Sequence, residues 1–131
     1  MNSETRKTFQ FKKNKYNAKP TTIDGIRFPS IGESELYLFN KARPEVVHID
    51  VHVPCTMIIG EGDKQEVIRY SVDQIVYIND HESIKPRVEA HEFKGIETAD
   101  FKLKMQIFNA VHPLAPLKVF KKSGKKIIQV Y

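Results

Sequence analysis

The sequence contains very little cysteine and no long apolar run. Cys55 is the single cysteine, so no disulfide can form within the chain and no group of cysteines can bind a metal. No apolar stretch approaches the roughly 20 residues that span a bilayer, which excludes a membrane-spanning helix. Residues 1–19 lack the apolar core of a secretory signal. These absences predict a protein of a reducing, cytoplasmic compartment with no membrane contact.

Acidic residues are missing from the end of the chain and scarce at its beginning. Residues 102–131 contain seven lysines and no acid, and residues 1–27 contain seven Lys or Arg against two acids. Positions 28–101 hold fourteen acids and seven basic residues, so the centre is acidic although the whole chain carries a net charge of +5. Basic flanks around an acidic centre fit a polyanion held from outside and a divalent cation held within. Charged tails that only aid solubility would give the same composition, so composition leaves both readings open.

The length and composition indicate one globular domain preceded by an arm. Residues 1–18 are polar and basic without a sustained period, which is typical of a flexible segment. The whole chain is 40% hydrophobic and 28% charged, as expected for an ordinary globular protein. We therefore predict a basic arm over 1–18 and a single domain over 19–131, without internal repeats.

Helical and alternating patterns succeed one another along the domain. Ser30 and Glu33 have the spacing of a helix capping box, and Thr98 is a plausible cap for a second helix. Helical spacing places Leu36 and Phe39, with Tyr37 as a further candidate, on the inner side of the first helix, and Phe101, Met105 and Phe108 on one side of the second. The predicted elements are a turn at Asp24-Gly25, a helix over 30–42, a strand over 46–54 that 56–59 continue or follow, strands over 66–78 and 87–94 joined by a turn over 79–83, a helix over 99–111, and closing strands over 117–120 and 127–131. This order predicts an α/β (α+β) fold in which helices flank a mixed central sheet.

Three acids and one lysine occupy notable places in this pattern. Asp73 lies inside the most apolar strand, where a carboxylate without a partner is costly. Glu92 and Lys94 share one face of the next strand, which a hairpin would place beside Asp73. Two adjacent carboxylates require a cation, and oxygen ligands without cysteine favour Mg²⁺ or Mn²⁺ over Zn²⁺. Glu33 could complete the site, but a surface pair of Glu92 with Lys94 and a purely capping Glu33 are the plain structural alternatives.

Taken together, these motifs resemble the PD-(D/E)xK nuclease superfamily. More closely, the chain is similar to a family of small phage proteins of unknown function that is grouped with these nucleases. That resemblance covers roughly residues 15–120 and rests on "KYNAKPTTIDGIRFPSIGESELY", on Tyr70 to Asp73 as Y-x-x-D, and on "EFKGIETADFKLK". A similar order of motifs occurs in the phage endonuclease I type of Holliday-junction resolvase.

The resemblance implies a role for each matched position. Asp73 and Glu92 would bind the catalytic metal with the Phe93 carbonyl, and Lys94 would position the attacking water. Glu33 would hold a metal-bound water or a second metal. Lys104, which the helical period places between Phe101 and Phe108, would face the scissile phosphate or Glu33, although a lysine passing along the core fits equally well.

The chain departs from the family pattern in two places. Gln74 stands where relatives usually have an aromatic residue, and Ile31-Gly32 stand where a basic residue is common, which puts substrate preference in doubt.

His48, Asp50 and His52 share one strand face and are read as a polar outer surface rather than as metal ligands. Cys55 has no basic neighbour and is read as inert packing.

The leading hypothesis is a Mg²⁺-dependent DNA endonuclease. By resemblance it would be selective for Holliday junctions or other branched DNA and would act in phage recombination or DNA processing, in the cytoplasm of a phage-infected or lysogenic host. A resolvase must cut two strands, so this reading implies a homodimer. The alternative is a non-catalytic nucleic-acid-binding or regulatory protein that retains the fold. The predicted DNA contacts are Lys12, Lys13, Lys15, Lys102, Lys121, Lys122, Lys125 and Lys126.

Overall fold

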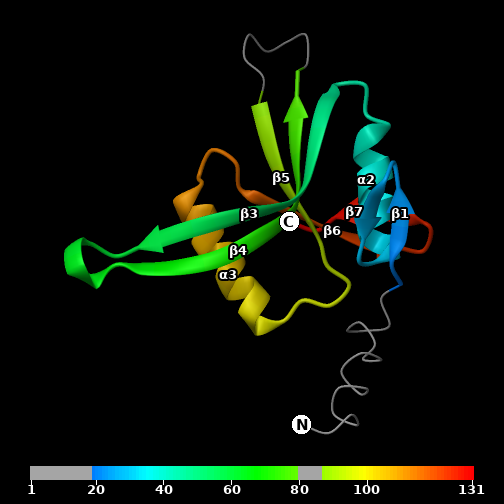
Figure 1. Cartoon of the computed structure of the whole chain (residues 1–131). Coiled ribbons are helices and arrows are strands. Elements are labelled where there is room, and N and C mark those ends of the chain that lie inside the picture. Colours follow the sequence, from blue (N-terminus) through cyan, green and yellow to red (C-terminus); the bar gives the residue numbers. More distant parts are fainter. Residues whose placement is uncertain (1–18, 80–86) are drawn as a thin grey trace, which may run out of the picture.

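The computed structural model describes residues 19–79 and 87–131, which form a mixed sheet with two helices and a small separate hairpin (Figure 1). The sheet order is β3-β4-β5-β6-β7, and every neighbouring pair is antiparallel except β5 with β6. The elements are β1 (Thr21–Ile23), β2 (Ile26–Phe28), α2 (Ile31–Lys41), β3 (Val46–Ile59), β4 (Glu66–Ile78), β5 (Arg87–Phe93), α3 (Ala99–Val111), β6 (Leu117–Ser123) and β7 (Lys126–Gln129), with a short 3-10 helix at Gly62–Lys64.

This arrangement confirms the predicted α+β class and the mixed sheet. The arm predicted over 1–18 and most of the turn predicted at 79–83 lie outside the described residues. None of the helices in the described ranges has both the length and the apolar surface needed to cross a bilayer.

Helix α2 begins where the capping signal predicts. The Ser30 side chain accepts a hydrogen bond from the Glu33 N–H at 3.2 Å. Leu36 and Tyr37 are buried as expected, but Phe39, predicted for the same side, is 42% exposed. Asn40 completes the inner face instead, because successive helical residues turn by 100° and Asn40 lies between Leu36 and Tyr37 around the axis.

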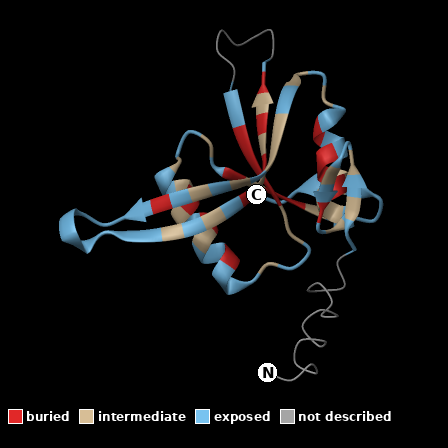
Figure 2. Ribbon diagram, in the orientation of Figure 1, coloured by how far each residue is buried: buried red, intermediate tan, exposed pale blue. Residues whose placement is uncertain are grey.

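Strands β3 and β4 form a long ribbon. β3 is continuous through Pro54, so 56–59 continue the predicted strand rather than forming another. Proline is tolerated because β3 is an edge strand. The outer part of the ribbon extends away from the rest of the sheet and its tip is exposed (Figures 1 and 2).

The parallel neighbours β5 and β6 are joined by α3. Parallel strands need a long crossover, and this helix supplies it. The Thr98 side chain caps α3 by accepting a hydrogen bond from the Phe101 N–H at 3.1 Å, as predicted. Phe101, Met105 and Phe108 form its buried side, also as predicted.

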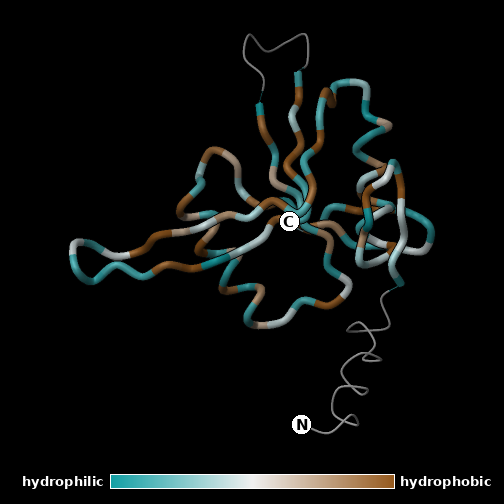
Figure 3. Tube along the Cα trace, in the orientation of Figure 1, coloured by the Kyte–Doolittle hydropathy of each residue, from teal (hydrophilic) through white to brown (hydrophobic). Residues whose placement is uncertain are grey.

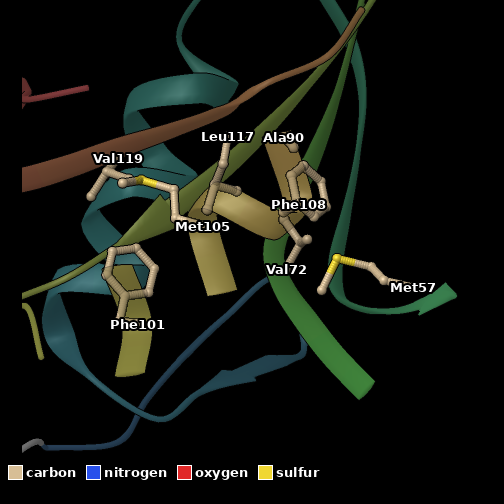
Figure 4. Close-up of a cluster of buried hydrophobic side chains, with 8 residues drawn as sticks. All are labelled: Met57, Val72, Ala90, Phe101, Met105, Phe108, Leu117 and Val119. Carbon is tan, nitrogen blue, oxygen red and sulfur yellow. The ribbon is translucent and has the colours of Figure 1, made fainter. Parts of the chain in front are cut away.

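The main apolar core lies between α3 and one face of the sheet (Figure 4). Hydrophobic and hydrophilic stretches alternate along the strands and helices (Figure 3). Ala90 belongs to this core, whereas the next residue, His91, bonds to Asn40 of α2. Since neighbouring strand residues point to opposite faces, α2 and α3 cover opposite faces of β5. The core residues are Met57, Val72, Ala90, Phe101, Met105, Phe108, Leu117 and Val119.

Candidate active site

Asp73 and Glu92 lie side by side on the neighbouring strands β4 and β5. The register pairs Gln74 with His91, so the next position along places Asp73 opposite Glu92. The Asp73 N–H donates to Glu92 Oε1 at 3.2 Å, and the Phe93 N–H donates to Asp73 Oδ2 at 2.8 Å. Each carboxylate therefore binds a main-chain N–H of the other strand at the point where the ladder between them ends. The juxtaposition expected from the hairpin is present in the structure.

The surroundings of this pair disfavour two negative charges. Glu92 is 4% exposed, and burial raises its pKa to about 7 against the opposing charge of Lys94. Burial also raises the pKa of Asp73 well above its usual value, and the charges of Glu92 and Glu33 raise it further. When they are ionised, Asp73, Glu92 and Glu33 together carry more negative charge than the single ammonium of Lys94 can offset.

Lys94 contacts the pair from the end of β5. Its Nζ lies 3.4 Å from Glu92 Oε2 and 4.7 Å from the centre of the Phe101 ring. The ring holds the ammonium by a cation–π contact and ties its position to the first turn of α3. Glu92 and Lys94 meet on one strand face, as their spacing predicts.

Glu33 approaches the pair from the first turn of α2. Its Oε2 accepts a hydrogen bond from the Ser30 hydroxyl at 3.1 Å, and its Oε1 lies 3.5 Å from His52 Nε2. Its charge is close enough to raise the pKa of both Asp73 and Glu92. Within residues 19–79 and 87–131, however, no three His, Cys, Asp or Glu side chains are close enough together to form a metal-binding group. Glu33 is therefore a neighbour of the pair rather than a member of a closed ligand set.

A half-buried tyrosine, Tyr70, lies beside the carboxylates with its hydroxyl oxygen buried. The Tyr70 hydroxyl forms no hydrogen bond of normal geometry with the described residues. Burial raises its pKa, and the charges of Glu92 and Asp73 raise it further. The Y-x-x-D motif thus brings the phenol and both acids to one place.

Lys104 is not drawn into this group. Its Nζ lies 3.4 Å from Asp100 on the same helix, and it has no contact with Glu33 in the described part of the chain. The side chain is 37% exposed, which fits the alternative of a lysine passing along the edge of the core.

The lysines predicted to bind DNA divide into three groups. Lys121 and Lys122 are already paired, with Glu97 at 2.6 Å and Glu35 at 2.7 Å. Lys125 and Lys126 are exposed and line an open groove beside Leu38 and Phe39 on α2, and Lys102 is exposed on α3. The remaining three, Lys12, Lys13 and Lys15, lie outside the described residues.

A buried polar network behind the site was missed from the sequence. The Asn40 amide donates to Gln74 Oε1 and lies 3.0 Å from His91 Nδ1, and the Gln74 amide donates to the Glu33 carbonyl at 3.3 Å. His91 Nε2 is 2.9 Å from Glu89, which also binds Lys118. Burial lowers the pKa of His91. Gln74 and His91 could have indicated this network, because they are polar residues in apolar strands and lie immediately next to Asp73 and Glu92.

The histidines of β3 do not share one role. His48 Nε2 lies 2.6 Å from Asp50 Oδ1 on the exposed face, as the outer-surface reading predicts. His52 differs, because its Nε2 faces Glu33 and its backbone has a φ of 52°. His52 is also exposed, as the outer-surface reading predicts, but a left-handed residue interrupts the strand there, and this is not visible in an alternating pattern. Burial raises the pKa of the Cys55 thiol, in agreement with its reading as inert packing.

Comparison with known proteins gives one result. No curated protein and no solved structure matches the chain significantly. Residues 13–127 match the family model described as "Protein of unknown function (DUF1064)", and because this match covers most of the chain, the protein belongs to that family.

Proposed function

We propose that this protein is a Mg²⁺-dependent DNA endonuclease with a PD-(D/E)xK core. The observation that carries the proposal is the contact of Asp73 with Glu92 on adjacent strands, with Lys94 at 3.4 Å from Glu92. The element order α2-β3-β4-β5-α3 places a glutamate on a helix, an aspartate on a strand and E-x-K on the next strand, which is the order that the superfamily core requires. Mn²⁺ is the alternative metal.

The chemistry of the donors fits a hard divalent cation. Asp73 and Glu92 offer carboxylate oxygens as ligands. Among the described residues, no cysteine or histidine side chain bonds to either of them, so the site has no soft ligand. Burial raises the pKa of both acids, so an added positive charge would stabilise their ionised forms. The buried Tyr70 hydroxyl adds a further polar oxygen beside them. Glu33 would join through a bound water rather than directly.

The residues of the chain would divide the work of phosphodiester hydrolysis. When bound, the cation would supply a water of lowered pKa and charge stabilisation at the phosphate. Asp73 and Glu92 would hold it, and the Phe101 ring would keep Lys94 where its ammonium can orient the water. Glu33 would accept a hydrogen bond from water on the side of α2. Lys104 can act on the phosphate only if it leaves Asp100.

DNA is the proposed substrate because of the charge pattern. The acidic site lies in the centre of a chain with basic ends, and Lys102, Lys125 and Lys126 remain exposed to bind phosphates. We propose branched DNA as the preferred form, a homodimer as the active unit, and phage recombination or DNA processing in the host cytoplasm as the setting, all three by resemblance to phage resolvases.

Plasmid DNA incubated with the protein, with and without Mg²⁺, tests the proposal directly. We expect nicking that requires Mg²⁺ and that disappears in Asp73→Asn and Lys94→Ala, while DNA binding persists. A four-way junction compared with a linear duplex of the same sequence tests the preference for branches. DNA binding without cleavage of any substrate would instead establish the alternative, a non-catalytic nucleic-acid-binding or regulatory protein.

A further inference from the structure

His52 has a backbone conformation that the strand around it does not require. Its φ of 52° lies in the left-handed region, and apart from glycines it shares this property with Asp24 alone among the described residues. Asp24 is in a hairpin turn, where the conformation is ordinary. His52 lies inside β3, where a left-handed conformation is unusual. Strained backbone of this kind concentrates at functional sites.

The position of His52 is next to the carboxylate site. The register pairs Val51 with Gln74 and Val53 with Val72, so His52 lies across from Asp73. Its Nε2 is 3.5 Å from Glu33 Oε1. The ribbon of β3 and β4 bends along its length (Figure 1). The left-handed residue lies inside β3 and brings an imidazole to the glutamate of α2.

A hollow opens beside His52. Its volume is about 350 Å³, and it is lined by Pro20, Arg27, Pro29 and His52. Arg27 is exposed and forms no ion pair with the described residues. Asp24, the acid of the β1–β2 hairpin that carries Arg27, is bonded to Tyr37 and Lys41 instead. The guanidinium is therefore available to an outside anion.

We propose that this hollow is a phosphate-binding subsite, in which Arg27 holds a backbone phosphate of the DNA and His52 orients Glu33. The inference rests on the proposed function, because it takes the substrate to be DNA. A guanidinium presents a planar fork of N–H donors that matches two phosphate oxygens. His52 lines the hollow, and its Nε2 lies 3.5 Å from the Glu33 carboxylate, so it links the phosphate subsite to that acid. Arg27 is thus a substrate-binding residue, and His52 is a positioning residue.

Binding of a short fluorescent DNA duplex over a range of salt concentrations tests the role of Arg27. We expect Arg27→Ala to weaken binding about fivefold at low salt and to reduce the slope of log Kd against log salt by about 1. Lys64→Ala, at the tip of the β3–β4 ribbon, removes the same charge and serves as the control with an unchanged slope. A slope for Arg27→Ala equal to that of Lys64→Ala overturns the subsite while leaving the nuclease proposal intact. Failure of the wild type to bind DNA overturns both.

The substitution His52→Asn tests the positioning role. Asparagine tolerates the left-handed backbone but is too short to replace the imidazole at Glu33. We expect kcat for DNA cleavage to fall about tenfold with little change in KM, the sign of an interaction that acts after binding. The Tm should stay within about 3 °C of the wild type or rise, because the backbone conformation is preserved. Wild-type kcat, or a loss of activity that follows a large fall in Tm, would show that His52 has no such role.

Discussion

The main-chain N–H of Asp73 donates a hydrogen bond to the carboxylate of Glu92, and the N–H that follows Glu92 donates to the carboxylate of Asp73. Each acid is thereby fixed by the backbone of the strand that carries the other. Neither N–H neutralises a full charge, so burial raises the pKa of both acids. The two acids are therefore stable either as a protonated pair or as an ionised pair that holds a cation.

Replacing Glu92 by Gln should stabilise the metal-free protein at high pH. The pKa of Glu92 is raised from its usual 4.5 to about 7, so its stabilising contribution is complete below about pH 4.5 and is lost as the pH rises through about 7. That change is worth roughly 3 kcal/mol. We therefore expect E92Q to exceed the wild type in free energy of unfolding at about pH 8, and to match it near pH 5, by urea denaturation with a chelator present.

The comparison must be made between variant and wild type rather than across pH alone. Burial lowers the pKa of His91, so His91 favours the folded state at higher pH, in the opposite direction. His91 is present in both proteins, and its effect cancels in the difference. An E92Q variant that is less stable than the wild type at about pH 8 would contradict the expected penalty for ionising Glu92.

Mg²⁺ should raise the melting temperature of the wild type near pH 8. A ligand that binds the folded state alone adds RT ln(1 + [L]/Kd), which reaches about 2.7 kcal/mol at a hundredfold excess over Kd. Asp73→Asn removes one of the two proposed ligands and should abolish most of the shift without unfolding the protein. Thermal melts with Mg²⁺, and with K⁺ at equal ionic strength as the control, separate binding from salt screening. An identical shift in both proteins would place the cation elsewhere.

Lys94→Ala should separate catalysis from binding. Lys94 contacts Glu92 and the Phe101 ring, and is 31% exposed. Its loss should lower the cleavage rate at saturating DNA by about 100-fold or more, while affinity changes little. Lys102→Ala, on the first turns of the adjoining helix, is the matched control: it should weaken DNA binding and leave the rate at saturation unchanged. Equal effects of the two substitutions on kcat would remove the special role of Lys94.

The local elements were predictable because their signals are local. Ser30 and Thr98 cap the two helices at the expected positions, and Phe101, Met105 and Phe108 pack on one side as their spacing predicts. The contact of Asp73 with Glu92 was also predictable, since a hairpin makes consecutive strands neighbours and a strand repeats every two residues. Sequence position and strand period were sufficient for these features.

Features that depend on long-range geometry were not predictable. The left-handed backbone of His52 lies inside β3, and no residue type in "VHVP" signals it. The pairing of Lys122 with Glu35 joins residues 87 positions apart, and nothing in either segment identifies its partner. Lys104 has the expected place on the helix, but the period cannot decide between Asp100 and the site for its ammonium. Each case needs the packing of elements that are distant in sequence.

Removing Asn40 should destabilise the protein more than its small size suggests. Its amide serves both Gln74 and His91, and all three side chains are completely buried. Asn40→Ala leaves two buried polar groups without their partner, at about 1–3 kcal/mol each, so we expect a loss of roughly 2–4 kcal/mol in urea denaturation. Gln129→Ala, which removes an exposed amide that binds the Tyr131 carbonyl, should cost less than about 0.5 kcal/mol.

The Gln74 amide also holds the carbonyl of Glu33, so cleavage by Asn40→Ala should fall even where the protein remains folded. Full activity in the folded variant would show that the network supports the fold but does not position the site.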